Sequence, residues 1–248
     1  MNPVTVSIHQ PNFMPWLKLV DKILASDVYV AYDTVQYTKT EYHARQKVKS
    51  LSGTVWLSVP VRHVRGVHQL IMDVLIDNSQ PFRRKHLKML RTTYERAPYF
   101  EELYPIVEDV YTRDQKHLVD LNMDLIEAIC SYLQCPVRIV RSSTLPHDGD
   151  RAERLVELVN KTGGTEHLTS TFGAVHQDVD WSRFVEAGIG IRAQQFQHPV
   201  YEQVGPGFVP NLAAIDMLFS CGRHTREILE QNRRLVAIDL ALAGTAGE

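Results

Sequence analysis

A dense set of polar and aromatic side chains occupies residues 8–16, directly after a short apolar run. His9 is a candidate general acid or base, or a phosphate ligand, and Gln10, Asn12 and Trp16 are candidate substrate-binding residues. Helix capping and loop hydrogen bonding are the alternative interpretation, but they require fewer such side chains than this turn contains. Because polar residues crowded onto a loop between rigid elements are usual at functional sites, we expect a site here.

A second segment, residues 33–49, interleaves cations with aromatic side chains. Asp33 directly follows an apolar run, and we predict that it is catalytic, orienting His9 or an acceptor amine. Lys39 and Arg45 are predicted to hold the phosphate of a substrate, because charge-assisted hydrogen bonds to phosphate are strong. A solvated basic loop is the alternative interpretation. Two further substrate-binding candidates of this segment are Gln36 and Tyr42.

A third set of polar residues comes late in the chain. His198, Tyr201 and Gln203 are predicted to bind substrate in the same cleft, because Pro199 holds the preceding residue extended and aims a loop. Cys221 is a candidate nucleophile, although a free cysteine is more often a small buried apolar residue.

The sequence does not predict a metal site. His63 and His68 lie close together, but no third ligand with supporting spacing accompanies them. The chain has 3 cysteines, and this odd number argues against a disulfide framework. We therefore expect a reducing, cytoplasmic environment.

The first candidate residues are positioned by a predicted strand–helix–strand unit. Residues 4–7 and 28–32 have the pattern of short strands, and residues 16–24 repeat apolar side chains at helical spacing, with Pro15 suited to the first helical position. Such a unit favours parallel strands joined by a right-handed crossover. Parallel strands end at the same edge of a sheet, so His9 and Asp33 are predicted to lie together.

The remaining pattern predicts the fold class. It is α/β: a Rossmann-like, mostly parallel sheet in one domain over residues 1–243, with a helical insertion at about 82–133 and a loose tail at 244–248. Further strands are expected at 55–61, 71–76, 137–140 and, as the last strand, 189–196, with helices at 151–161 and 212–219.

Composition excludes some partners. The formal net charge is -2, so the chain as a whole gives no reason to expect nucleic-acid binding. No apolar run approaches the roughly 20 residues that span a bilayer, so no membrane insertion is expected. An anionic small molecule must instead be met by a local cluster of cations.

Taken together, these segments resemble the WbqC-like family. The resemblance extends from residue 8 to residue 222, and it implies work on a sugar or nucleotide-activated sugar. Two departures are His43-Ala44-Arg45, where the family pattern has Asn-Arg, and Ala213-Ala214, where it has Ser. The matching segments are residues 9–16, 33–39, 56–61, Arg154-Leu155 and 198–203, with Asp216 and Gly222.

Our leading functional hypothesis is a transferase that moves an acyl or aminoacyl group onto an amino-sugar or nucleotide-activated sugar. Polysaccharide or specialised-metabolite biosynthesis is the setting that the family resemblance implies. One alternative is a Cys-dependent acyltransferase with Cys221 as nucleophile. A second is a non-catalytic nucleotide-sugar binding or scaffold protein. The expected partner is a small phosphate-bearing substrate; the sequence identifies neither a cofactor nor an oligomeric state.

Overall fold

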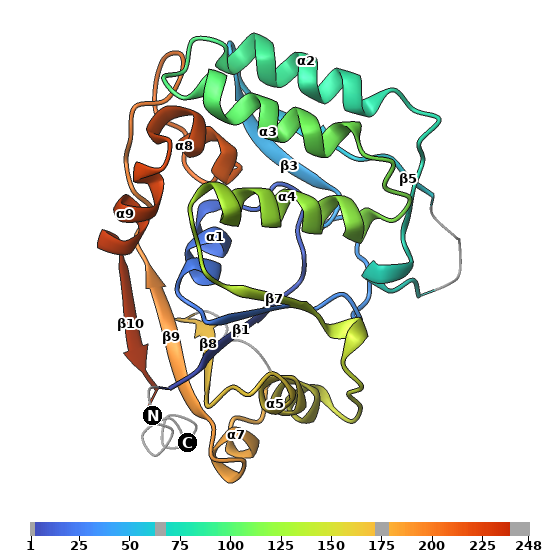
Figure 1. Ribbon diagram of the computed structural model, residues 1–248, viewed down its shortest axis with the longest axis vertical. Coiled ribbons are helices and arrows are strands. Elements are labelled where there is room, and N and C mark those ends of the chain that lie inside the picture. The colour runs from blue at the N-terminus through green and yellow to red at the C-terminus, as the bar shows by residue number, and fades with distance from the viewer. Residues whose placement is uncertain (1–2, 63–67, 172–178, 239–248) are drawn as a thin grey trace.

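The centre of the molecule is a mostly parallel sheet. The computed structural model describes residues 3–62, 68–171 and 179–238 (Figure 1). In the described chain the main sheet has 6 strands in the order β10-β9-β8-β1-β2-β7. Neighbouring strands pair in parallel, except that β10 runs antiparallel to β9. The strands are β1 (Thr5–His9), β2 (Val28–Ala31), β7 (Arg138–Arg141), β8 (Glu166–Ser170), β9 (Gly190–Phe196) and β10 (Arg233–Ala237).

The strand order reverses beside β1. From β1 the chain continues to β2 and then β7 on one side, and it later returns to place β8 and β9 on the other side. At such a reversal the connecting helices leave toward opposite faces of the sheet, and a crevice opens at the carboxyl ends of the two central strands. In this chain those strands are β1 and β8.

Helices cover both faces of the sheet (Figure 1). One core contains α1 (Leu17–Leu24) and the α4 helix (Leu118–Tyr132), and the other contains α5 (Arg151–Lys161) and α7 (Ser182–Glu186). Side chains of β2 alternate between them, with Tyr29 in the first core and Val30 in the second. Burial on both faces explains why β2, with the sequence Val-Tyr-Val-Ala, has no charged side chain.

The chain between β2 and β7 forms a separate layer beyond α1. Figure 1 shows α2, α3 and α4 stacked above the sheet, next to a β-hairpin. After β9, two further helices, α8 and α9, pack beside α1 and α3. The elements are β3 (Arg45–Ser50), β4 (Gly53–Ser58), β5 (Val61–Arg62), η1 (Ile71–Asp73), β6 (Leu75–Ile76), α2 (Phe82–Tyr94), α3 (Phe100–Thr112), η2 (Ser142–Thr144), α8 (Ala214–Cys221) and α9 (His224–Gln231).

The α/β class and the mostly parallel sheet are confirmed, but several predicted elements are wrong. Residues 71–76 form a short 3-10 turn and a two-residue strand instead of one strand. The helix after β1 begins at Leu17, because Trp16 is extended and bridges to Ala213. Strand β9 is followed by β10, so it is not the last. The predicted tail, 244–248, lies outside the described residues.

Strands β3, β8 and β10 have too many polar residues to be recognised from the sequence. Their charged side chains find partners that the sequence pattern does not show. Glu166 of β8, for example, forms an ion pair of 2.9 Å with Arg192 of β9. In the described chain, no helix is both long and apolar enough to cross a membrane.

Asn122 of α4 fixes the position of the loop that follows β1. Its side-chain amide donates hydrogen bonds of 2.8 Å to the backbone oxygens of Pro11 and His43. Asn122 is fully buried, so water cannot replace it as a donor to these two carbonyl groups. The helical layer therefore holds the end of β1 through one side chain.

We predict that Asn122→Ala destabilises the protein. Two buried carbonyl oxygens lose their donor, which costs roughly 1–3 kcal/mol of unfolding free energy. Urea denaturation measures the change. The control is Asn160→Ala on the exposed side of α5, which should change stability by less than about 0.5 kcal/mol. Equal stabilities of the two variants would contradict this structural role.

Candidate functional site

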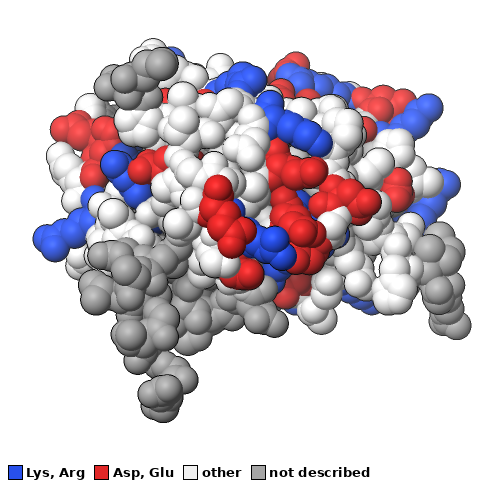
Figure 2. All heavy atoms as spheres, turned by 90° about the horizontal axis from the view of Figure 1, so that it is seen from below, with Lys and Arg blue, Asp and Glu red and all other residues white. Residues whose placement is uncertain are grey.

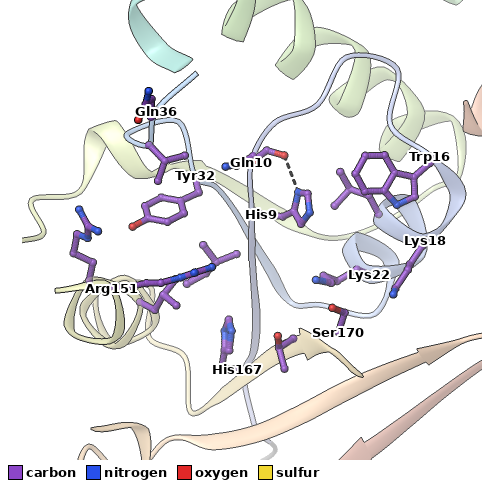
Figure 3. A pocket seen from close by; sticks show the side chains of 16 residues that line it. His9, Gln10, Trp16, Lys18, Lys22, Tyr32, Gln36, Arg151, His167 and Ser170 are labelled. Atoms are coloured by element: carbon purple, nitrogen blue, oxygen red, sulfur yellow. Dashed lines mark hydrogen bonds between the residues drawn. The ribbon is translucent and has the colours of Figure 1, made fainter. Parts of the chain in front are cut away.

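A cavity of about 690 Å³ lies at the carboxyl ends of β1 and β8, where the strand order reverses. Its walls come from the end of β1, the first turns of α1 and α5, residues 32–36 after β2, and the end of β8. A volume of roughly 300–1,000 Å³ is typical of small-molecule sites. Figure 3 shows His9 between Arg151 on one side and Lys18 and Lys22 on the other.

His9 ends β1 and presents a neutral imidazole. Its Nδ1 lies 2.9 Å from the backbone oxygen of Gln10. A carbonyl oxygen only accepts, so Nδ1 carries the proton and Nε2 keeps its lone pair. Burial, followed by the positive charge of Lys22, lowers the pKa of His9 to about 3. The Trp16 ring packs edge-on against the imidazole, with centroids 5.7 Å apart.

Cations from two helices line the cavity: Lys18 and Lys22 of α1, and Arg151 and Arg154 of α5. Within the described chain, the side chains of these residues form no hydrogen bond or ion pair. Lys22 is only 6% exposed, and burial together with Lys18 lowers its pKa to about 8. The described residues that line the cavity include no carboxylate. The site is therefore strongly positive.

This positive cavity differs from the face of the protein seen in Figure 2. The face seen in Figure 2 has Lys and Arg side chains interspersed with Asp and Glu, as the slightly negative total charge leads one to expect. Solvated faces usually carry mixed charges, whereas a cavity of one sign attracts a ligand of the opposite sign. The arrangement fits an anion.

Two further side chains complete the walls. His167 of β8 is 3% exposed, packs against Phe184, and has its pKa lowered to about 3 by burial and by Lys22. The hydroxyl of Tyr32 is buried and has no hydrogen-bond partner within the described chain. It can therefore donate to or accept from a bound molecule.

Of the residues predicted from the sequence, His9, Gln10, Trp16 and Gln36 line this cavity. Gln10 also accepts a hydrogen bond of 2.9 Å from Nε2 of His43, which fixes its side chain. Asn12 does not line the cavity, because it is buried beneath the loop at 2% exposure. The first candidate segment thus supplies most of the predicted residues that the structure brings together.

Asp33 does not orient His9, contrary to the prediction. Its carboxylate accepts hydrogen bonds from Nε of Arg141 at 2.7 Å, Oγ of Ser142 at 2.9 Å, and both N and Oγ of Ser143. Burial alone would raise the pKa of Asp33, but these hydrogen bonds outweigh burial and lower it. The side chain ties the end of β2 to the end of β7, and its oxygens are already engaged.

The predicted basic loop ends in strand β3, which carries Arg45 and Lys47, and the cations of the segment do not line the cavity. The charged groups of Arg45 and Lys47 lie over the Trp56 ring, 4.6 and 5.0 Å from its centroid. Tyr42 packs between Trp16 and Trp56, and Lys39 is exposed outside the cavity. Cation–π contacts therefore account for the mixture of cations and aromatics that suggested phosphate binding.

The three predicted residues of the late polar segment do not line this cavity. His198 lines a smaller hollow of about 220 Å³ that shares Trp16 and Lys18 with it. Tyr201 donates a 2.7 Å hydrogen bond to buried Asp216, and Gln203 accepts one from buried Lys49. The prediction that all three approach His9 is wrong for Tyr201 and Gln203, which hold a polar network inside the protein.

The candidate nucleophile Cys221 loses support. Cys221 ends α8 outside the His9 cavity, and burial, followed by Asp216, raises the pKa of its thiol. A protonated thiol remote from His9 is a poor nucleophile. His63 lies outside the described residues, and the described chain has no cluster of three His, Cys, Asp or Glu residues able to hold a metal.

Sequence reasoning missed the cavity cations. Lys18 and Lys22 look like the solvated face of an amphipathic helix, because a charge pattern does not show which side of the helix is covered. The resemblance to the family did single out Arg154, and this was the one available signal. Strand β8, which brings His167 and Ser170 to the site, was not recognised.

Buried histidines should make the protein acid-sensitive. Burial lowers the pKa of His9 and His167 to about 3, and that of His43 and His86 to about 4. Below the unfolded value near 6.5, the unfolded chain binds protons that the folded chain does not. Unfolding free energy therefore falls as pH decreases from about 6.5 to 4, by about 1.4 kcal/mol per proton and pH unit.

Urea denaturation between pH 7 and pH 5 measures this slope. His86→Gln should reduce the slope of unfolding free energy against pH by the contribution of close to one proton, because one buried histidine is removed. His224→Gln, which changes an exposed histidine, should leave the slope unchanged. Identical slopes for wild type and His86→Gln would show that burial does not hold His86 neutral.

Comparison with known proteins places the chain in a family. The model of the WbqC-like protein family matches residues 10–228. A relative from Mycobacterium tuberculosis (strain ATCC 25618 / H37Rv), "Uncharacterized protein Rv1507c", is 31% identical over 233 residues, which are 92% of this chain and 99% of the relative. No solved structure matches. The chain belongs to the WbqC-like protein family.

Proposed function

We propose that this protein is a transferase that moves an acyl or aminoacyl group onto an amino-sugar or nucleotide-activated sugar in polysaccharide or specialised-metabolite biosynthesis. One observation carries the proposal: four cations without partners in the described chain surround a cavity that also contains neutral His9. The strand order β7-β2-β1-β8-β9 supports it, because dinucleotide-binding Rossmann sheets have this order and hold phosphates in the same crevice.

The cations suit the phosphate groups of such a substrate. Lys18 and Lys22 act as point charges, whereas the guanidinium groups of Arg151 and Arg154 can donate paired hydrogen bonds to phosphate or carboxylate oxygens. Tyr32 and Gln36 offer polar groups for sugar hydroxyls, and the Trp16 ring provides an apolar wall. The cavity is large enough for a drug-sized ligand.

His9 is the proposed general base. Its Nε2 takes the proton from the acceptor amine or hydroxyl as that nitrogen or oxygen attacks the acyl carbonyl carbon. The new amide or ester bond forms, the bond to the leaving group breaks with its electron pair, and His9 returns the proton to that group. A pKa near 3 makes the empty-site imidazole a weak base. A bound anion would raise its basicity by offsetting the charge of Lys22.

A non-catalytic nucleotide-sugar binding protein is the second candidate. It is favoured by the engagement of Asp33, which leaves His9 without a carboxylate partner in the described chain. Both candidates require binding in the cavity, and they differ in whether turnover occurs.

Lys22→Met should weaken binding of a nucleotide sugar. UDP-N-acetylglucosamine is the probe, and its dissociation constant, measured by calorimetry, should increase about tenfold or more when one charge-assisted contact is lost. Lys22 loses its proton as pH rises through about 8, so wild-type affinity should fall between pH 7 and pH 9. Lys22→Arg should keep its affinity over this range, because arginine stays charged.

The control is Lys47→Met, which removes a cation stacked on Trp56 outside the cavity. Its affinity should equal that of the wild type. A similar loss of affinity in Lys47→Met and Lys22→Met would show that the overall charge of the protein governs binding. The cavity would then not be the binding site.

His9→Gln should separate catalysis from binding. Glutamine can keep polar contacts to the ligand but cannot accept and return a proton, so turnover should fall about 10²- to 10⁴-fold. The dissociation constant of the nucleotide sugar should change less than threefold. Mass spectrometry of reactions with amino-sugar nucleotides and acyl or aminoacyl donors detects the product. Unchanged turnover would exclude His9 as the base, and no product with any donor would favour the binding protein.

A further inference from the structure

The four cavity cations form two pairs that reach the site from opposite faces of the sheet. Lys18 and Lys22 are one helical turn apart on α1, which packs in the first core. Arg151 and Arg154 are on the first turn of α5, which packs in the second core. Figure 3 shows Arg151 across the cavity from Lys18 and Lys22, with His9 between them.

Each pair is unfavourable without a bound anion. Lys18 is the second residue of α1 and Arg151 the first residue of α5. The amino-terminal turn of a helix has a partial positive charge and favours anions, so a cation there is unfavourable. Like charges also repel within each pair, and Lys22 is nearly withdrawn from water at 6% exposure.

The burial of the cavity cations and their lack of partners in the described chain indicate where an anion can bind. Within the described chain, Lys22 has no counter-charge, and Nε of Arg154 is buried without a hydrogen-bond partner. Native proteins rarely leave buried donors unsatisfied, because an unpaired buried donor is destabilising. One pair thus has a nearly buried charge without a counter-charge and the other a buried donor without a partner, so one anion beside one pair would leave the other uncompensated.

We propose that the cavity contains two anion subsites, one formed by Lys18 and Lys22 and one formed by Arg151 and Arg154, on either side of His9. The inference rests on the proposed function, in which the cavity holds the substrate. It adds that two anionic groups are bound at once. Either the substrate is anionic at both ends, or donor and acceptor each carry a phosphate or carboxylate.

Inorganic phosphate is the probe for counting subsites. Calorimetric titration at low ionic strength should give two phosphate ions per chain for the wild type. The double variants Lys18→Met/Lys22→Met and Arg151→Met/Arg154→Met should each bind one, with at least tenfold weaker binding at the altered subsite. The matched control, Arg45→Met/Lys47→Met, removes two cations stacked on Trp56 and should still bind two. Circular dichroism checks that each variant is folded.

Other results would overturn the inference in distinguishable ways. A single phosphate in the wild type, weakened by both cavity variants, would reject two subsites and leave the proposed function standing. Phosphate binding that is the same in both cavity variants and the control would reject both proposals.

A second titration then distinguishes one substrate that is anionic at both ends from a donor and an acceptor that each carry an anionic group. If donor and acceptor bind separately, the affinity of UDP-N-acetylglucosamine should depend on one cation pair, and inorganic phosphate should still bind to the saturated protein. If one molecule spans the cavity, a sugar bisphosphate should bind more tightly than phosphate and lose affinity in both double variants. If the affinities of a sugar bisphosphate and of UDP-N-acetylglucosamine are both unchanged in the two double variants, the subsites do not bind the substrate.

Discussion

The candidate site depends on the Lys22 side chain, which is nearly buried at the cavity and has no counter-charge in the described chain. Burial of an unpaired charge is costly, so the surrounding structure must fix the helix that carries it. The apolar side of α1, with Leu19 and Ile23, is buried in the first core. The adjacent Asp21 is no partner for Lys22, because its carboxylate is bound by Arg233 and Gln194. Lys22 therefore remains available to a ligand in the cavity.

Several polar residues of the family motifs serve this rigidity. Asp33 joins the ends of β2 and β7 through Arg141, Ser142 and Ser143. Asp216 accepts hydrogen bonds from Tyr94 and Tyr201, so two hydroxyl groups satisfy a buried carboxyl group whose pKa burial raises. Such fully bonded networks specify one arrangement of the interior, because a partly satisfied network would be costly.

His9 connects the electrostatics of the cavity to its proposed chemistry. The same positive charges that attract an anion lower the basicity of the imidazole, after the larger effect of burial. Ligand binding and proton affinity are therefore coupled: an anion beside Lys22 favours the protonated form of His9. A base activated by its own substrate would be inactive in the empty cavity, and this limits unproductive proton transfer.

The sequence by itself determined the first strand–helix–strand unit, the α/β class and the place of His9. These features depend on local hydrophobic spacing and on where strands end. Only the tertiary structure decided which charged residues belong to the cavity. Pairing of β3 with β4 places Arg45 over Trp56. Asp33 binds Arg141, which is more than 100 residues away in the sequence. Arg151 and Lys22 reach one cavity because α5 and α1 pack on opposite faces of the sheet. A side chain's charge is local information, whereas its exposure and its partners depend on what the rest of the chain covers.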